Sequence, residues 1–140
     1  MTIASPLLLD TCAAIWIAEA QRLSRSATDA LEQVYESGTS VYVSPISAWE
    51  IGTLASRRRL NLQIEPRLWF RRLFAILNFR EAELPWEILL SSSFLPGTPP
   101  RDPADRILAA TAREFGFRLV TRDRPLLKYA EQGHIQALAC

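Results

Sequence analysis

Short strand-length segments alternate with helix-length segments along this chain. Segments 7–9, 41–43 and 118–121 are three or four residues long and rich in Leu and Val, which is typical of buried strands in a parallel sheet. Shorter extended segments are expected within 79–84 and at 134–138. Apolar periodicity predicts helices at 11–20, 27–37, 45–59, 66–77, 85–90 and 103–115, and a last helix from residue 125. The alternation predicts an α/β fold in which helices cover both faces of a parallel sheet.

Two helices begin with recognisable capping residues. Ser26, with Asp29 three residues later, resembles a capping box and is expected to start the helix that ends before Gly38. Asp102 is placed as an N-cap, with Pro103 as the first helical residue. The residue at which each helix starts determines which face of the helix the following side chains occupy.

The bulk composition indicates an ordinary globular protein. A chain of 140 residues, 49% hydrophobic and 22% charged, suits a single domain that spans residues 1–140. The net charge of +1 gives no global argument for nucleic-acid binding. Nothing resembles a signal peptide or a membrane span, so a cytoplasmic protein with reduced thiols at Cys12 and Cys140 is expected.

The residue inventory narrows the chemistry to carboxylates. His134 is the only histidine, which excludes nucleases that use two histidines and histidine-rich metal sites. The cysteines lack metal-ligand spacing, and the sequence contains no Gly-rich phosphate loop. Asp and Glu are therefore the residues left to carry a reaction.

Two aspartates follow predicted strands. Asp10 comes directly after 7–9, and Asp123 comes two residues after 118–121. Ligand sites in α/β sheets lie outside the carboxyl ends of the strands, so these two acids are candidate site residues. Taken singly, each has an alternative interpretation as a helix cap or turn residue.

Glu50 occupies an unusual place on its predicted helix. At about 100° per residue, it lies on the apolar arc between Ile46 and Leu54 rather than opposite to it. A carboxylate on a buried face requires a partner, because an unpaired buried charge is costly. The sequence leaves two partners open, an arginine or a metal ion.

The helical face also distinguishes the role of Asp102 from that of Asp105. Asp102 is the better cap for the helix that starts at Pro103. Asp105 shares a face with Leu108, whereas Arg106 points away. Asp105 is therefore the better candidate ligand.

These acids considered together point to a metal site. Four of the five aspartates stand at these junctions, and Glu50 adds a further carboxylate. Clustered carboxylates repel one another, so such a site usually holds a cation. Oxygen ligands without His or Cys suit Mg²⁺ or Mn²⁺, which promote attack of water on a phosphodiester.

The order of LLLDT, SAWEIG, RDPADRILAATA and LVTRD resembles the PIN-domain ribonucleases, and more narrowly the VapC toxins of bacterial toxin–antitoxin pairs. The resemblance runs from residue 7 to 123. It implies a three-layer α/β/α fold and an acidic pocket for Mg²⁺ or Mn²⁺ at the strand ends. The catalytic and metal-binding acids of the family map onto Asp10, Glu50, Asp105 and Asp123.

Neighbouring positions are also matched by the resemblance. Thr11 and Thr121 match small hydroxyl residues beside the site, and Asp102 matches an acid that serves as a cap or supports the ligands from behind. Arg101 stands where many family members carry a histidine, so the role of this position is open.

The resemblance implies a metal-dependent endoribonuclease that cuts RNA and, as a toxin, inhibits growth and translation. It also implies a small cognate antitoxin, a toxin homodimer and a hetero-oligomer with the antitoxin. Trp69, Phe70 and Phe74 are either core residues or part of such a partner surface. The arginines after the third helix either contact RNA phosphates or form a solvated helix end: Arg57, Arg58 and Arg59.

Two other functions compete with the toxin hypothesis. One is a PIN-domain nuclease that processes RNA without a toxin role. The other is a catalytically silent domain that binds RNA or a partner. Four retained acids argue against the silent domain, because it has no need to hold mutually repelling charges together.

Overall fold

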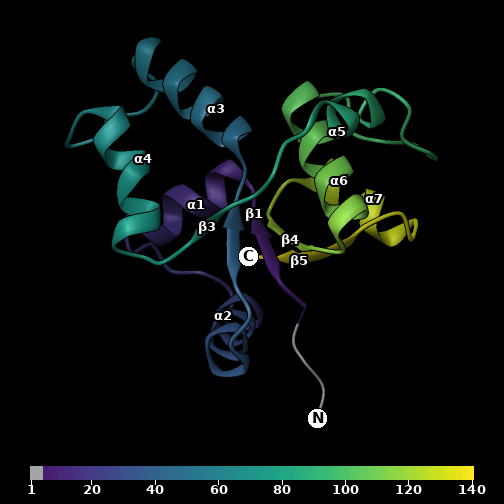
Figure 1. The fold of residues 1–140 in the computed structure, drawn as a ribbon, viewed down its shortest axis with the longest axis horizontal. Helices are drawn as coiled ribbons and strands as arrows, with labels where there is room; N and C mark the ends of the chain where they lie inside the picture. Colours follow the sequence, from purple (N-terminus) through teal and green to yellow (C-terminus); the bar gives the residue numbers. More distant parts are fainter. Residues whose placement is uncertain (1–4) are drawn as a thin grey trace.

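Five parallel strands form the centre of the molecule (Figure 1). The computed structural model describes residues 5–140, and its strands lie in the order β3-β2-β1-β4-β5. Their bounds are β1 (Leu7–Leu9), β2 (Val41–Val43), β3 (Arg80–Glu81), β4 (Arg118–Thr121) and β5 (Gln136–Ala139). From β1 the chain builds outward to β2 and β3, and the two later strands lie on the other side of β1. The strand order therefore reverses between β1 and β4, which is where α/β sheets bind ligands.

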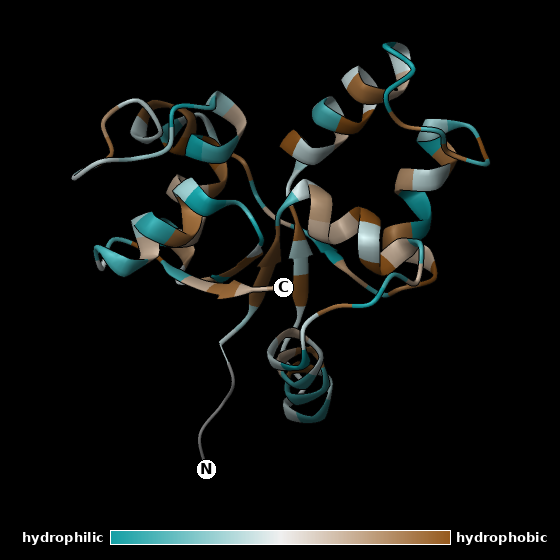
Figure 2. Ribbon diagram, turned by 180° about the vertical axis from the view of Figure 1, so that it is seen from behind, coloured by the Kyte–Doolittle hydropathy of each residue, from teal (hydrophilic) through white to brown (hydrophobic). Residues whose placement is uncertain are grey.

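Helices cover both faces of this sheet, as the alternating pattern predicts. Within residues 5–140 the helices are α1 (Thr11–Ala18), α2 (Arg25–Ser37), α3 (Pro45–Ser56), α4 (Pro66–Ala75), α5 (Trp86–Ser91), α6 (Pro103–Phe115) and α7 (Arg124–Glu131). Leu7 and Leu9 pack into a core with α1, α2 and α4, whereas Leu8 packs into a core with α6 and α7. Figure 2 shows the hydrophobic residues along these central strands. The three-layer α/β/α expectation is confirmed.

The start of α2 differs from the sequence prediction. Ser24, not Ser26, is the N-cap: its Oγ accepts from the Ala27 N–H at 3.0 Å and donates to the Ala139 carbonyl at 2.9 Å. The second bond joins α2 to β5 across 115 positions in sequence. Local spacing could not reveal that contact, so the Ser26 prediction was wrong. Gly38 ends the helix in the left-handed conformation, as predicted.

Other boundaries shift by a few residues. α1 ends at Ala18 instead of residue 20, where Ala20 adopts a positive φ of 55°. The last helix starts at Arg124, one residue earlier than predicted, and β5 covers Gln136–Ala139 instead of 134–138. None of the helices in residues 5–140 is both long and apolar enough to span a bilayer.

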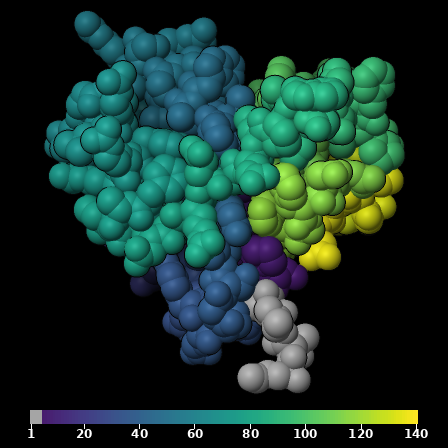
Figure 3. Space-filling view, viewed as in Figure 1, coloured from purple at the N-terminus to yellow at the C-terminus, as the bar shows by residue number. Residues whose placement is uncertain are grey.

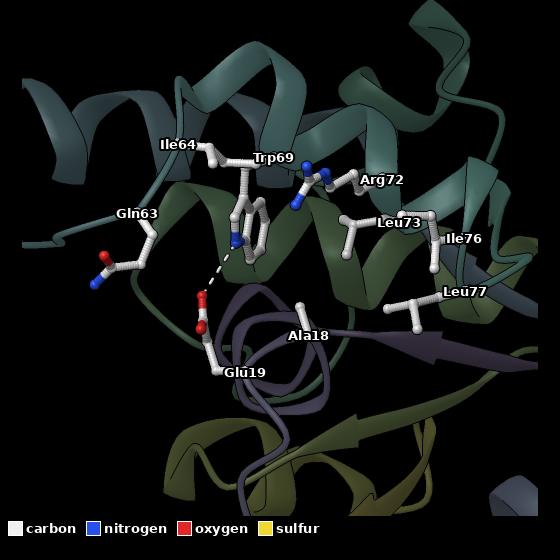
Figure 4. Close-up of a pocket in the computed structure, with 9 residues that line it drawn as sticks. All are labelled: Ala18, Glu19, Gln63, Ile64, Trp69, Arg72, Leu73, Ile76 and Leu77. Atoms are coloured by element: carbon white, nitrogen blue, oxygen red, sulfur yellow. Dashed lines mark hydrogen bonds between the residues drawn. The ribbon is translucent and has the colours of Figure 1, made fainter.

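α4 is attached to α1 through a buried tryptophan. The Trp69 Nε1–H donates to the Glu19 Oε1 at 3.1 Å, and Leu73 is buried one turn further along α4 (Figure 4). Trp69 is therefore a core residue, while Phe70 and Phe74 are half-buried and touch edge to face. A cavity of about 240 Å³ lies between the two helices, and none of the four candidate acids lines it.

Several exposed apolar residues lie together in sequence around α5. Trp86 is 67% exposed and Phe94, just beyond the helix, is 82% exposed. Leu89 and Leu90 are exposed between them. The sequence pattern gave α5 no special role, because a six-residue helix shows too little periodicity to separate a buried face from an exposed one.

The two bonds of the Ser24 hydroxyl make a stability prediction. Ser24→Ala should lower the free energy of unfolding by about 1–2 kcal/mol, because it removes a cap and a bond to β5. Ser26→Ala is the matched control and should change stability by less than about 0.5 kcal/mol, since Ser26 is exposed. Urea unfolding of the two variants measures the difference. A larger loss in Ser26→Ala would contradict the observed helix start.

Candidate active site

The candidate acids gather at the carboxyl edge of the sheet, where the strand order reverses. Asp10 follows β1, Asp123 follows β4, and Glu50 and Asp105 project from α3 and α6. In Figure 3 the surface is hollowed at this edge, between the lobe with α3 and α4 and the lobe with α5 and α6. Four segments that are distant in sequence therefore supply carboxylates to one region.

Asp10 is buried and uses both carboxylate oxygens. Its Oδ1 accepts from the Ala13 N–H at 2.7 Å, which caps α1, and its Oδ2 accepts from the Thr121 hydroxyl at 2.6 Å. Burial raises the pKa of Asp10, and the charge of Asp123 raises it further, whereas the two hydrogen bonds lower it. The capping interpretation is correct, but it leaves acceptor capacity free on each oxygen.

Glu50 is half-buried and is held by a threonine. The Thr11 hydroxyl donates to the Glu50 Oε1 at 2.5 Å and lies 2.9 Å from the hydroxyl of the fully buried Ser47. Burial raises the pKa of Glu50, as do the charges of Asp102 and Asp10. No basic side chain is among the groups that shift this pKa, so the arginine-partner interpretation finds no support in the described residues.

Asp102 and Asp105 separate as the helical faces predict. Asp102 is exposed, and its Oδ2 accepts from the Asp105 N–H at 3.0 Å, which makes it the N-cap of α6. Asp105 is half-buried. Burial raises its pKa to about 7 from the ordinary 3.8, and the charges of Asp123, Asp102, Glu50 and Asp10 contribute. The negative charges of all the other candidate acids therefore act on Asp105.

Thr121 connects two of the acids. While its hydroxyl donates to Asp10, it accepts from the Asp123 N–H at 3.0 Å. The Asp123 Oδ2 accepts from the Leu126 N–H at 3.1 Å, so Asp123 caps α7. Thr11 and Thr121 both lie beside the acids, and each donates a hydrogen bond to one of them.

The donor set suits a hard divalent cation, although the side chains do not close around one. Within residues 5–140, no three His, Cys, Asp or Glu side chains are arranged as a ready metal-binding group. The cluster offers only oxygen ligands, which Mg²⁺ and Mn²⁺ prefer, and Mg²⁺ usually binds through few carboxylates while keeping several waters. The residues fit such an ion, and their assignment as ligands remains a prediction.

The other predicted basic residues are exposed. The exposed arginines Arg57, Arg58 and Arg59 follow the end of α3, and their contact with RNA remains a prediction. Arg101 is exposed next to Asp102. Ser47 was not among the residues predicted from the sequence, where its only signal is its position one helical turn before Glu50.

Comparison with known families agrees with this geometry. The model of the PIN-domain family matches residues 7–132. The chain belongs to the PIN-domain family. The residues matched by the family model include every candidate acid.

One curated relative of this PIN domain is "Ribonuclease VapC22" of Mycobacterium tuberculosis (strain ATCC 25618 / H37Rv). It is 39% identical over 121 residues, which cover 86% of this chain and 88% of that protein. The similarity to VapC-type PIN proteins inferred from the motifs is therefore confirmed.

Two solved structures share the fold of this PIN domain. VapBC2 from Rickettsia felis, bound to a DNA fragment from its promoter, matches with a TM-score of 0.66 and 14% identity, over 96% of this chain and 98% of that chain. FitAcB from Neisseria gonorrhoeae matches with a TM-score of 0.55 and 20% identity, over 94% and 96%. At these identities the two structures show the fold alone.

The raised pKa of Asp105 predicts a pH-dependent stability of the metal-free protein. Between pH 7 and 3.8 the folded protein holds a proton on Asp105 that the unfolded chain has released, so stability should rise as the pH falls through 7. Asp105→Asn should remove part of this rise and be more stable than the parent at pH 8. Urea unfolding in EDTA from pH 5 to pH 8 measures both effects.

Asp102→Ala is the contrasting variant for this test. It removes the cap of α6 and should cost about 1 kcal/mol across the same pH range. If Asp105→Asn lost stability at pH 8 as Asp102→Ala does, Asp105 would be a structural residue and not a repelled member of the acid cluster.

Proposed function

We propose that this PIN domain is an endoribonuclease that depends on Mg²⁺ or Mn²⁺ and acts as the toxin of a toxin–antitoxin pair. The observation that carries the proposal is the gathering of Asp10, Glu50, Asp105 and Asp123 at one edge of the sheet, where burial and the charges of neighbouring acids raise the pKa of the first three. Repulsion of this kind is relieved by a cation. The similarity to Ribonuclease VapC22 supports RNA as the substrate.

The four acids would hold the metal, and the threonines would hold the acids. When bound, the ion supplies positive charge that polarises a phosphodiester and lowers the pKa of bound water. Thr11 fixes Glu50 and Thr121 fixes Asp10 through hydrogen bonds of 2.5 and 2.6 Å. Fixed carboxylates do not have to be reoriented when substrate arrives, and such preorganisation is a main source of electrostatic catalysis.

Two surfaces are available for the proposed partners, a cognate antitoxin and a second copy of the chain. The first is a groove of about 600 Å³ between α3 and α4, lined by Ile51, Phe70 and Phe74 together with two arginines. The second is the exposed apolar surface of α5 around Trp86 and Phe94. Contiguous apolar surfaces of this kind usually mark interaction sites. The resemblance to VapC toxins supports a homodimer, a complex with the antitoxin and a cytoplasmic location.

The metal requirement is tested on RNA. Purified protein, free of antitoxin, should cut single-stranded or structured RNA in Mg²⁺ or Mn²⁺ and should stop in EDTA, because the clustered acids favour a bound cation. Gel electrophoresis of labelled RNA measures the reaction, and adding back Mn²⁺ should restore it. Equal cleavage in EDTA would overturn the metal-dependent mechanism.

The acids themselves are tested by isosteric neutralisation. Glu50→Gln keeps an oxygen that accepts from Thr11 but loses its charge, so it should abolish cleavage and melt at or above the parent temperature without metal. Asp10→Asn should behave in the same way. Glu114→Gln, at an exposed position of α6, is the control and should remain active.

The same variants test the toxin role in cells. Induced expression of the parent and of Glu114→Gln should arrest bacterial growth, and expression of Glu50→Gln should not. Lower melting temperatures for both Glu50→Gln and Asp10→Asn would support a structural role for these acids. RNA cleavage without growth arrest would favour a processing nuclease over a toxin.

A further inference from the structure

Another cavity adjoins the acid cluster. It has a volume of about 400 Å³ and lies between the loop before α6 and the helix α7. Asp105 and Asp123 belong to its lining, so it opens directly onto the acids. Lys128 and Arg101 also line it, as does the Pro125 ring. Its volume is within the range of about 300–1,000 Å³ that is typical of small-molecule sites.

The loop over this cavity is fixed in place. The Tyr129 hydroxyl donates to the Pro96 carbonyl at 2.6 Å, and the Thr98 N–H donates to the Gln132 Oε1 at 3.1 Å. Gly97 has a φ of 70°, and a Cβ at this position would lie 2.3 Å from the His134 Nε2. A side chain at Gly97 would therefore have to displace His134 or Gln132, and the two hydrogen bonds hold the loop in place without a ligand.

Two basic residues line the cavity beside three aspartates, so a phosphodiester that enters it can reach both kinds of group; the aspartates are Asp102, Asp105 and Asp123. Lys128, the only lysine of the chain, is exposed on α7, and Arg101 is exposed on the loop. A phosphate placed between Lys128 and Arg101 would gain two charge-assisted contacts.

We propose that this cavity is a nucleotide subsite for RNA, in which Lys128 and Arg101 bind the phosphate next to the scissile bond. The sugar and base of that nucleotide pack on the ring of Pro125. The assignment rests on the proposed nuclease function, since a chain that presents a phosphodiester to Asp105 and Asp123 must run along this wall. Phosphate contacts of this kind position RNA without reading its sequence.

The test measures binding without cleavage. A fluorescent single-stranded RNA of about twelve nucleotides is titrated by anisotropy in EDTA over a range of NaCl concentrations. Lys128→Gln should weaken binding of unrelated RNA sequences alike and should reduce the slope of log K against log salt by about 0.7, the value for one lost contact to a single strand. Lys128→Arg should restore the slope.

Arg118→Gln is the matched control. It removes one positive charge at the start of β4, on the opposite edge of the sheet, and should leave the slope of the parent unchanged. In Mn²⁺, Lys128→Gln should raise KM for RNA cleavage and leave kcat nearly unchanged, whereas a purely structural defect would lower kcat and the melting temperature.

The outcomes separate this subsite from the nuclease proposal. A parent protein that binds RNA but cuts none would refute the nuclease, and the salt slopes would still decide the subsite. Equal slopes for Lys128→Gln and the parent would overturn the subsite, whether or not RNA is cut. A parent that binds no RNA, or an equal loss of slope in Arg118→Gln, would overturn it as well.

Discussion

Carboxylates that are gathered away from bulk water repel one another, and the arrangement around β1 compensates for this repulsion. Asp10, Asp102 and Asp123 are the N-caps of α1, α6 and α7, so three helices begin at the acid cluster. Each helix start carries a partial positive charge of roughly half a unit, which favours nearby anions. The helix starts and the threonine hydroxyls therefore stabilise the same charges that burial and proximity destabilise. The pKa of Asp105 is still raised to about 7, so the compensation is incomplete, and a bound cation would stabilise the charged cluster further.

This dual use explains why the sequence could not decide between cap and ligand. A capping aspartate and a metal-binding aspartate both follow a strand and precede a helix, and here Asp10 and Asp123 occupy that position for both reasons. For Glu50 and Asp105 the position on the helix was informative. A carboxylate on the apolar face of a helix is costly to bury unless it has a partner, so its presence there indicates a site. The strands, the layers and most helix starts could be predicted for the same local reasons.

Features that depend on distant segments could not be predicted. Ser24 was overlooked because its second partner, the Ala139 carbonyl, is at the other end of the chain. Ser47 and the α7 cavity were missed for the same reason, since each requires two segments to be docked before their residues meet. The exposure of Trp86 and Phe94 also depends on what the rest of the chain leaves uncovered. From residue type alone, such side chains are expected in the core.

The helix α7 connects two of the acids. Its first turn is capped by Asp123, and its later turns hold the loop through Tyr129 and Gln132. That loop leads directly into Asp102 and thus into the first turn of α6, where Asp105 lies. A helix keeps a fixed rise of about 1.5 Å per residue, and two hydrogen bonds tie the loop to the end of this helix, so Asp105 and Asp123 are linked through a rigid helix and an anchored loop.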